Sequence, residues 1–167
     1  MDNRHLRNFR EEDFEAFHAL VSDFDVVKML ASWPWPPDPA FTRARMTTPE
    51  VKAGQVCVIE VGGKFAGSIG GVDGGLGCML APSFWGQGIA TWATQKMLDD
   101  GFRKHGWKIA KAGCWEDNHA SAAVLRKCGF REVGEEVAYC KARGCDLRGL
   151  NFELARAEWE KQQVARP

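Results

Sequence analysis

The sequence predicts an α/β (α+β) domain built on a mixed sheet, and three observations lead to this prediction. Its 167 residues are the size of one domain, and 45% hydrophobic with 26% charged residues is ordinary for a globular protein. Short β-branched segments alternate with longer segments in which apolar residues recur at helical spacing. No repeat, low-complexity tract or long linker interrupts the chain, so we expect a single domain over residues 1–167.

The first half of the chain predicts two short helices followed by a strand meander. An apolar stripe with acids in its first turn predicts a helix over residues 11–21. A Trp- and Pro-rich loop at 33–39 cannot continue a helix, and a second helix is expected from Pro39 to about Met46. Strands are expected at 55–61, 65–71 and 76–81, the first two joined by a glycine turn.

The second half predicts one long helix, one short helix and three more strands. A glycine-rich turn at 82–88 leads into a helix that reaches about His105. A strand at 109–115, a helix at 120–128 and strands at 131–141 and 148–155 follow, and the chain ends in a charged tail. Strands before and after helices favour a mixed sheet.

Charge and cysteine usage exclude several classes. Twenty-two basic residues balance twenty-two acidic ones, so no overall field favours nucleic acid or an anionic membrane. No apolar run approaches the ~20 residues that span a bilayer, and the N-terminus lacks a signal-like stretch, so we expect a cytoplasmic protein. The six cysteines form no Cys-x-x-Cys pair, and Cys140 and Cys145 lack partners for a zinc site. Reduced, mostly buried thiols and no metal are expected.

The turn Trp85-Gly86-Gln87-Gly88 stands between a strand and a long helix. A helix N-terminus after a glycine-rich turn binds phosphate through free amides and a positive dipole end. Tight turns before helices use the same glycines, so the motif alone leaves both interpretations open. The residues of a nucleoside-triphosphate loop and of a dinucleotide fingerprint are absent.

A second group of residues follows the 109–115 strand. Asn118 and Ser121 come where that strand gives way to a helix, and Leu125-x-x-Cys128-Gly129-Phe130 follows. Asn118 suits a helix N-cap, which is a purely structural role.

These motifs together resemble the GNAT acetyltransferase superfamily. The segment from Trp85 to Thr91, followed by Asn118-x-x-Ser121 and the Gly129-Phe130 ending, is similar to that family, and more narrowly to its RimJ/RimL-like branch. The opening 7–13, the Trp-Pro-Trp-Pro loop and the ending 146–154 with Glu158-Trp159 are also similar to that branch. The resemblance implies a bacterial-type, single-domain GNAT fold: a mixed, mostly antiparallel central sheet flanked by helices and splayed in the middle for acetyl-CoA.

The resemblance also implies roles for individual residues. Backbone amides would hold the coenzyme A pyrophosphate, and a strand edge would pair with its pantetheine arm. The amide of Leu80 would stabilise the oxyanion, and Asn118 would contact the cofactor or orient the reacting centre. Ser121 is expected to protonate the leaving thiol, because the family's usual tyrosine falls at Leu125; a plain helix residue is the alternative. The expected cofactor contacts are Met79, Leu80, Ala81, Gln87, Gly88, Ile89, Ala90, Thr91 and Asn118.

The catalytic base is not assigned by the sequence. The two glutamates that the branch often carries fall at Gly75 and Trp92 in this chain. Glu116 and Asp117 stand near the site, and a water chain is the other route for deprotonating an amine of low pKa. Trp33, Trp35 and Tyr139 are expected acceptor contacts; for the two tryptophans, packing on the core is the alternative.

The function expected on these grounds is acetyl-CoA-dependent N-acetyl transfer, directly from the thioester to a primary amine. The acceptor is a peptide N-terminus or a small-molecule amine, and a homodimer is possible. The alternative is a coenzyme A-binding sensor or scaffold with little catalysis, which the two missing carboxylates motivate.

Overall fold

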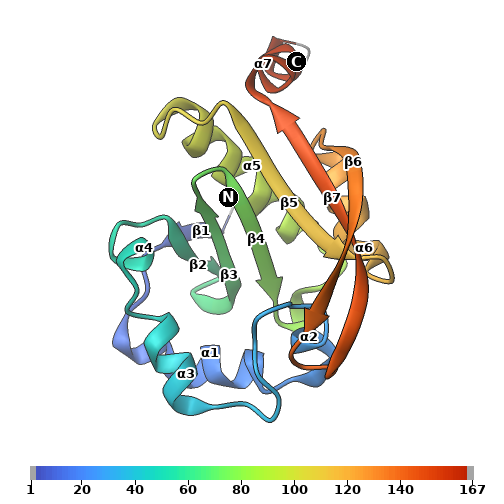
Figure 1. Cartoon of the computed structure of the whole chain (residues 1–167). Helices are drawn as coiled ribbons and strands as arrows, with labels where there is room; N and C mark the ends of the chain where they lie inside the picture. Colours follow the sequence, from blue (N-terminus) through green and yellow to red (C-terminus); the bar gives the residue numbers. More distant parts are fainter. Residues whose placement is uncertain (1–2, 165–167) are drawn as a thin grey trace.

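The strands of the computed structural model, which describes residues 3–164, form one seven-stranded sheet in the order β1-β2-β3-β4-β5-β7-β6 (Figure 1). The ends of the predicted domain, 1–2 and 165–167, lie outside the described residues. All neighbouring strands are antiparallel except β4 and β5, which confirms the mixed, mostly antiparallel sheet. The strands are β1 (Arg4–Arg7), β2 (Val56–Val61), β3 (Lys64–Val72), β4 (Gly75–Leu80), β5 (Ile109–Trp115), β6 (Arg131–Cys140) and β7 (Cys145–Ala155).

Helices cover one face of the sheet and one end of the other face. The long helix α5 lies behind the strands in Figure 1, while α1 and α3 lie at the lower end of the sheet. The α-helices are α1 (Phe14–Val21), α2 (Phe24–Val27), α3 (Pro39–Arg45), α4 (Pro49–Lys52), α5 (Ile89–Arg103), α6 (His119–Lys127) and α7 (Arg156–Val164). Single 3₁₀ turns precede α1 (η1, Glu11–Asp13) and α5 (η2, Pro82–Phe84).

Two apolar clusters hold these layers together, one on each face. Alternate strand residues such as Ile69 and Phe152 pack with Leu98 and Phe102 of α5 on the helix-covered face. Trp115 packs on the opposite face with Phe17 of α1 and other residues of α1 and α2. Burial of apolar area on both faces is the main stabilising contribution to the fold.

The sheet opens between its two parallel strands. β4 and β5 pair only at Gly75–Lys111 and Leu76–Ala112, whereas β5 stays paired with β7 from Ile109 to Trp115. β4 meanwhile remains paired with β3 to its last residue. A side chain at Gly67 would collide with the Met79 carbonyl, so glycine there lets β3 follow β4 closely as it turns away.

Most predicted elements are confirmed within a few residues, and the predicted charged tail is wrong. Residues 156–164 form helix α7. Its one strong anchor is Trp159, which is buried and stacks on Phe102 with ring centroids 5.1 Å apart. Such a helix has too weak an apolar stripe to be read from sequence. The short elements β1, α2 and α4, of four residues each, were not predicted either.

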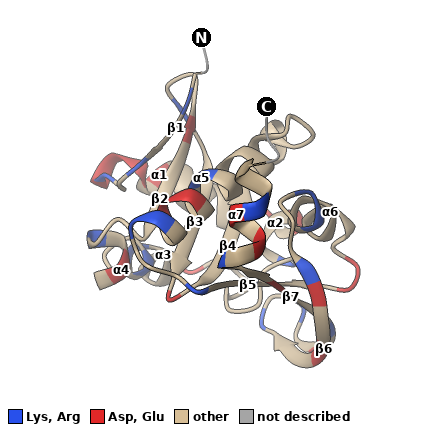
Figure 2. Ribbon diagram, turned by 90° about the horizontal axis from the view of Figure 1, so that it is seen from above, with Lys and Arg blue, Asp and Glu red and all other residues tan. Residues whose placement is uncertain are grey.

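The surface carries both signs of charge over the described residues, interspersed among the elements (Figure 2). Five of the six thiols are buried or half-buried, and Cys145 is exposed. In the part of the chain that the structure covers, no helix combines the length and apolarity required to cross a membrane.

Candidate active site

A cleft of about 590 Å³, the central cleft, lies where β4 and β5 part. Its walls are the end of β4, the first turns of α5 and α6, the middle of β5 and a segment around α2. Residues that the sequence did not single out also line it: Asp25, Val26, Met29, Leu30, Ala31, Cys78, Phe84, Thr94 and Cys114. The cleft therefore joins three stretches that are far apart along the chain, 25–31, 76–94 and 112–125.

The glycine-rich turn places the start of α5 against this cleft. Gly86 and Gly88 have φ of +72° and +74°, a left-handed conformation that favours glycine, and an added Cβ at either would meet open space. No side chain caps the helix, and its first internal bond runs from the Trp92 amide to the Gly88 carbonyl at 3.0 Å. The amides before Trp92 are thus free to bind an anion.

Most of the predicted turn residues line the central cleft, and one does not. Gly88, Ile89, Ala90 and Thr91 are among the lining residues. Gln87 is not, and its side-chain amide donates to the Ser83 carbonyl at 2.9 Å, so its predicted role depends on its backbone amide alone.

The end of β4 offers a backbone edge to the cleft. Met79 and Leu80 line it, and the Leu80 carbonyl accepts a hydrogen bond from Trp85 Nε1 at 2.8 Å. Ala81 differs from the prediction, because its amide donates to the Ala66 carbonyl at 2.9 Å and its side chain packs in the opposite apolar cluster. We therefore keep Met79 and Leu80 as candidate contacts and propose none for Ala81.

Asn118 and Ser121 lie together at the start of α6. Asn118 Oδ1 accepts from the Ser121 amide at 3.1 Å, which confirms the helix-capping role, and both residues line the cleft. Leu125, where the family's tyrosine would fall, is buried in the same wall and carries no hydroxyl.

The two cysteines of the central cleft are poor nucleophiles. Burial raises the pKa of Cys78 to about 12. Burial also raises the pKa of Cys114, although a hydrogen bond with Ser121 partly opposes the increase. Both thiols therefore stay protonated near neutral pH, which favours direct transfer over a cysteine-bound intermediate.

The cleft wall that the sequence did not predict is formed by Asp25, Val26, Met29, Leu30 and Ala31, the 25–31 wall. The loop between β6 and β7 holds it in place. Arg143 Nε donates to the Lys28 carbonyl at 2.8 Å, and Lys141 N donates to the Ala31 carbonyl at 3.2 Å. Partners more than a hundred residues apart leave no local signal in the sequence.

The two carboxylates left open as bases are both paired with arginines. Arg143 binds Asp117 through two bonds of 2.6 and 3.1 Å, and this hydrogen bonding lowers the pKa of Asp117. Glu116 accepts from Arg148 Nη1 at 3.2 Å. Trp92, at one of the missing glutamate positions, lies under the Arg4 guanidinium at 5.1 Å from the ring centre. Neither carboxylate is a free base.

The predicted aromatic acceptor contacts lie elsewhere. Trp33 is 4% exposed and packs edge-on against Phe17 and Phe41 with centroids 5.4 and 5.3 Å away, so it is a core residue and we propose no acceptor contact for it. Trp35 is exposed and packs on Phe24, and Tyr139 is exposed on β6. Neither is among the residues that line the central cleft.

A family model for the acetyltransferase (GNAT) domain matches residues 4–131. The chain belongs to this family. As a GNAT member it is an acetyltransferase, and its single α/β domain with a sheet that opens in the middle is the matching fold.

Solved structures share the fold over almost the whole chain. A GNAT-family acetyltransferase from Bacillus anthracis superposes with a TM-score of 0.77 at 21% identity, over 94% of this chain and 97% of that one. RimJ from Mycobacterium smegmatis, in complex with CoA-disulfide, gives 0.76 at 25% identity over 97% and 88%. A spermidine N-acetyltransferase from Vibrio cholerae, in complex with CoA and spermine, gives 0.76 at 15% over 95% and 98%. No curated protein sequence matches significantly.

The described residues contain no group of three or more His, Cys, Asp or Glu side chains placed to hold a metal ion.

Proposed function

We propose that this GNAT acetyltransferase uses acetyl-CoA and transfers its acetyl group directly to a primary amine. The observation that carries the proposal is the central cleft, which joins an uncapped helix N-terminus, a β4 backbone edge and the Asn118–Ser121 pair. An anion, an extended amide-bearing arm and a leaving thiol would each meet a suitable group.

The residues present fit acetyl-CoA. The free amides at the start of α5 suit its pyrophosphate, with open space over Gly86 and Gly88 for close approach. Met79 and Leu80 suit the pantetheine amides, in the manner of a strand added to an open edge. The RimJ neighbour, solved with CoA-disulfide, supports this cofactor. When bound, acetyl-CoA supplies the activated acetyl group.

The chain's own groups then have distinct tasks. The Leu80 amide donates to the oxyanion that develops on the acetyl carbonyl. As the new C–N bond forms and the C–S bond breaks, the Ser121 hydroxyl would protonate the leaving sulfur and regain a proton from the acylated nitrogen, directly or through water. Asn118 holds the start of α6, and with it Ser121, through its capping bond.

The acceptor best suited to this cleft is an α-amine. Asp25 is the one acidic side chain among the lining residues, and it is paired with Lys28 at 2.6 Å. A free α-amino group, with a pKa of about 8, is substantially neutral near pH 7.5 without a dedicated base, whereas an alkylamine such as lysine, near 10.4, is not. This supports a peptide-directed, RimJ/RimL-like enzyme, which we propose to be bacterial and cytoplasmic.

The second candidate is a coenzyme A-binding sensor with little catalysis. The observation in its favour is that Gly75 and Trp92 replace two carboxylates and that Glu116 and Asp117 are paired with arginines. Under this alternative the cleft binds the cofactor and releases no thiol.

Thiol release from acetyl-CoA, measured with peptide and polyamine acceptors, distinguishes the acetyltransferase from the coenzyme A-binding sensor. If the protein is an active enzyme, thiol release should depend on the acceptor. It should fall in Ser121→Ala, while acetyl-CoA binding is unchanged. Binding without release for every acceptor would support the sensor, and absence of binding would contradict both.

A further inference from the structure

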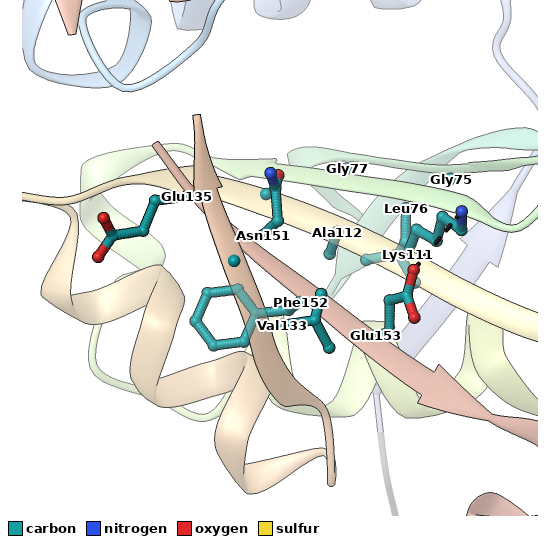
Figure 3. A pocket seen from close by; sticks show the side chains of 12 residues that line it. Gly75, Leu76, Gly77, Lys111, Ala112, Val133, Glu135, Asn151, Phe152 and Glu153 are labelled. Carbon is teal, nitrogen blue, oxygen red and sulfur yellow. Dashed lines mark ion pairs between the residues drawn. The ribbon is translucent and has the colours of Figure 1, made fainter. Parts of the chain in front are cut away.

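A second hollow, of about 680 Å³, lies on the sheet face that α5 does not cover. It sits over the paired half of β4 and β5 and extends across β7 to β6 (Figure 3). Helices α1 to α3 cover only the lower end of this face in Figure 1, so the upper end is bare. We call it the glycine hollow, because Gly75, Gly77, Gly113 and Gly134 are among its lining residues.

Neither backbone conformation nor close packing requires glycine at positions 77 and 113, whereas Gly134 adjoins the register shift of β6 that begins after Glu132. An added Cβ at Gly77 or Gly134 would meet nothing within 4 Å, and at Gly113 the nearest atoms are 3.5 Å away. None of the three has a left-handed φ. Glycine weakens a strand interior, and within sheets it marks bulges or places where a ligand or another backbone approaches closely. Because these positions carry no side chains, the strand backbones form an open floor to the hollow.

The glycine hollow communicates with the central cleft. Both are lined by Leu76, Gly77, Ala112 and Gly113, the residues at which β4 and β5 stop pairing. A ligand lying on the floor would reach through this opening toward the Leu80 end of the cleft. The other face of the sheet, packed against α5, offers no comparable approach.

The polar groups of the hollow are nearly neutral as a set. Lys111 Nζ lies 3.5 Å from Glu153 Oε1, and Glu135 accepts from Arg148 Nε at 2.8 Å. Asn151 makes no side-chain hydrogen bond to the described residues; its Oδ1 leans over Gly113, and its amide points into the open space (Figure 3). An unpaired amide offers one acceptor and two donors, the complement of a peptide group.

We infer that the glycine hollow is the acceptor site and that it takes a primary amine with an uncharged, amide-bearing body, such as a short peptide. This rests on the proposed function. The floor accommodates a flat peptide plane, Asn151 binds its amide, and the amine reaches the cleft between the strands. Polycations such as polyamines are disfavoured, because both carboxylates of the hollow are already paired.

The test uses the whole protein with two probe acceptors, trialanine amide and spermidine. Wild type is expected to show at least tenfold higher kcat/KM for trialanine amide. Gly134→Val adds a side chain to the hollow and not to the central cleft, so it should raise KM for trialanine amide at least fivefold and leave the acetyl-CoA Kd unchanged. Asn151→Ala should raise the same KM about threefold, a small hydrogen-bond effect.

Gly149→Ala is the control for adding a side chain to this face of the sheet outside the hollow. Gly149 is a β7 glycine on the same sheet face, outside the hollow, and its added Cβ would make only ordinary contacts at 3.7 Å. It should leave both KM and Kd unchanged. An unchanged KM in both Gly134→Val and Asn151→Ala, a preference for spermidine, or turnover of neither probe would overturn the inference. Loss of acetyl-CoA binding in wild type would instead contradict the proposed function.

Discussion

The two ends of the central cleft are built in different ways. The proposed cofactor end consists of consecutive residues, from Gly86 to Thr91, whose backbone amides belong to one turn and one helix start. We propose that the acceptor end lies between the opening to the glycine hollow and the 25–31 wall, which Arg143 holds from the other end of the chain. On this proposal, local backbone geometry provides cofactor binding and long-range side-chain contacts shape the acceptor end. Substitutions at one end should therefore leave binding at the other end unchanged.

The largest expected effect is on the chemical step, which needs both ends. Ser121→Ala should lower kcat about 100-fold, as for the loss of a general acid, with little change in acetyl-CoA Kd. Single-turnover thiol release and calorimetric binding check this. Asn118→Asp, which retains a capping oxygen, serves as the control for helix integrity; an unchanged kcat in Ser121→Ala would exclude Ser121 as proton donor.

The next effect is confined to the cofactor end. Gly88→Val should weaken acetyl-CoA binding at least tenfold, because a β-branched residue costs about 1–2 kcal/mol in a left-handed conformation and its side chain occupies the anion's space. Gly63→Val is the matched control, since Gly63 has the same φ of +74° and the same open surroundings in a hairpin turn remote from the cleft. Equal binding by the two variants would contradict the assignment.

A smaller effect should appear at the acceptor end alone. Arg143→Gln removes the bond to the Lys28 carbonyl and the pair with Asp117. The KM for a peptide amine should rise about fivefold, roughly 1 kcal/mol, while acetyl-CoA Kd stays constant. Lys104→Gln, which breaks an exposed pair with Asp100 on α5, is the control. A change in acetyl-CoA Kd without a change in acceptor KM would contradict the assignment of the 25–31 wall to the acceptor end.

The smallest effect concerns pH. Hydrogen bonding with Arg143 lowers the pKa of Asp117, so the pair is fully formed above the ordinary aspartate pKa of about 4 and is lost only as the pH falls below it. The acceptor KM, corrected for amine protonation, should therefore be constant from pH 9 down to about pH 5. A step in that range, present in wild type and absent in Asp117→Asn, would contradict this account of the wall.

The same contrast explains what the sequence could predict. The turn at Gly88, the cap at Asn118 and the strand at 109–115 follow from local patterns, and the structure has all three. Trp33 carried no local signal to separate a core residue from an acceptor contact; its place follows from packing on Phe17 and Phe41. The 25–31 wall and the glycine hollow arise from pairing between distant strands and loops, which no window of sequence contains.

Calorimetric titration of the purified protein with acetyl-CoA tests the central claim most directly. We expect one site per chain, with a Kd in the micromolar to sub-millimolar range usual for enzyme substrates. Binding should be weaker in Gly88→Val and unchanged in Gly63→Val. No binding to the wild-type protein, or binding that Gly88→Val leaves intact, would contradict it.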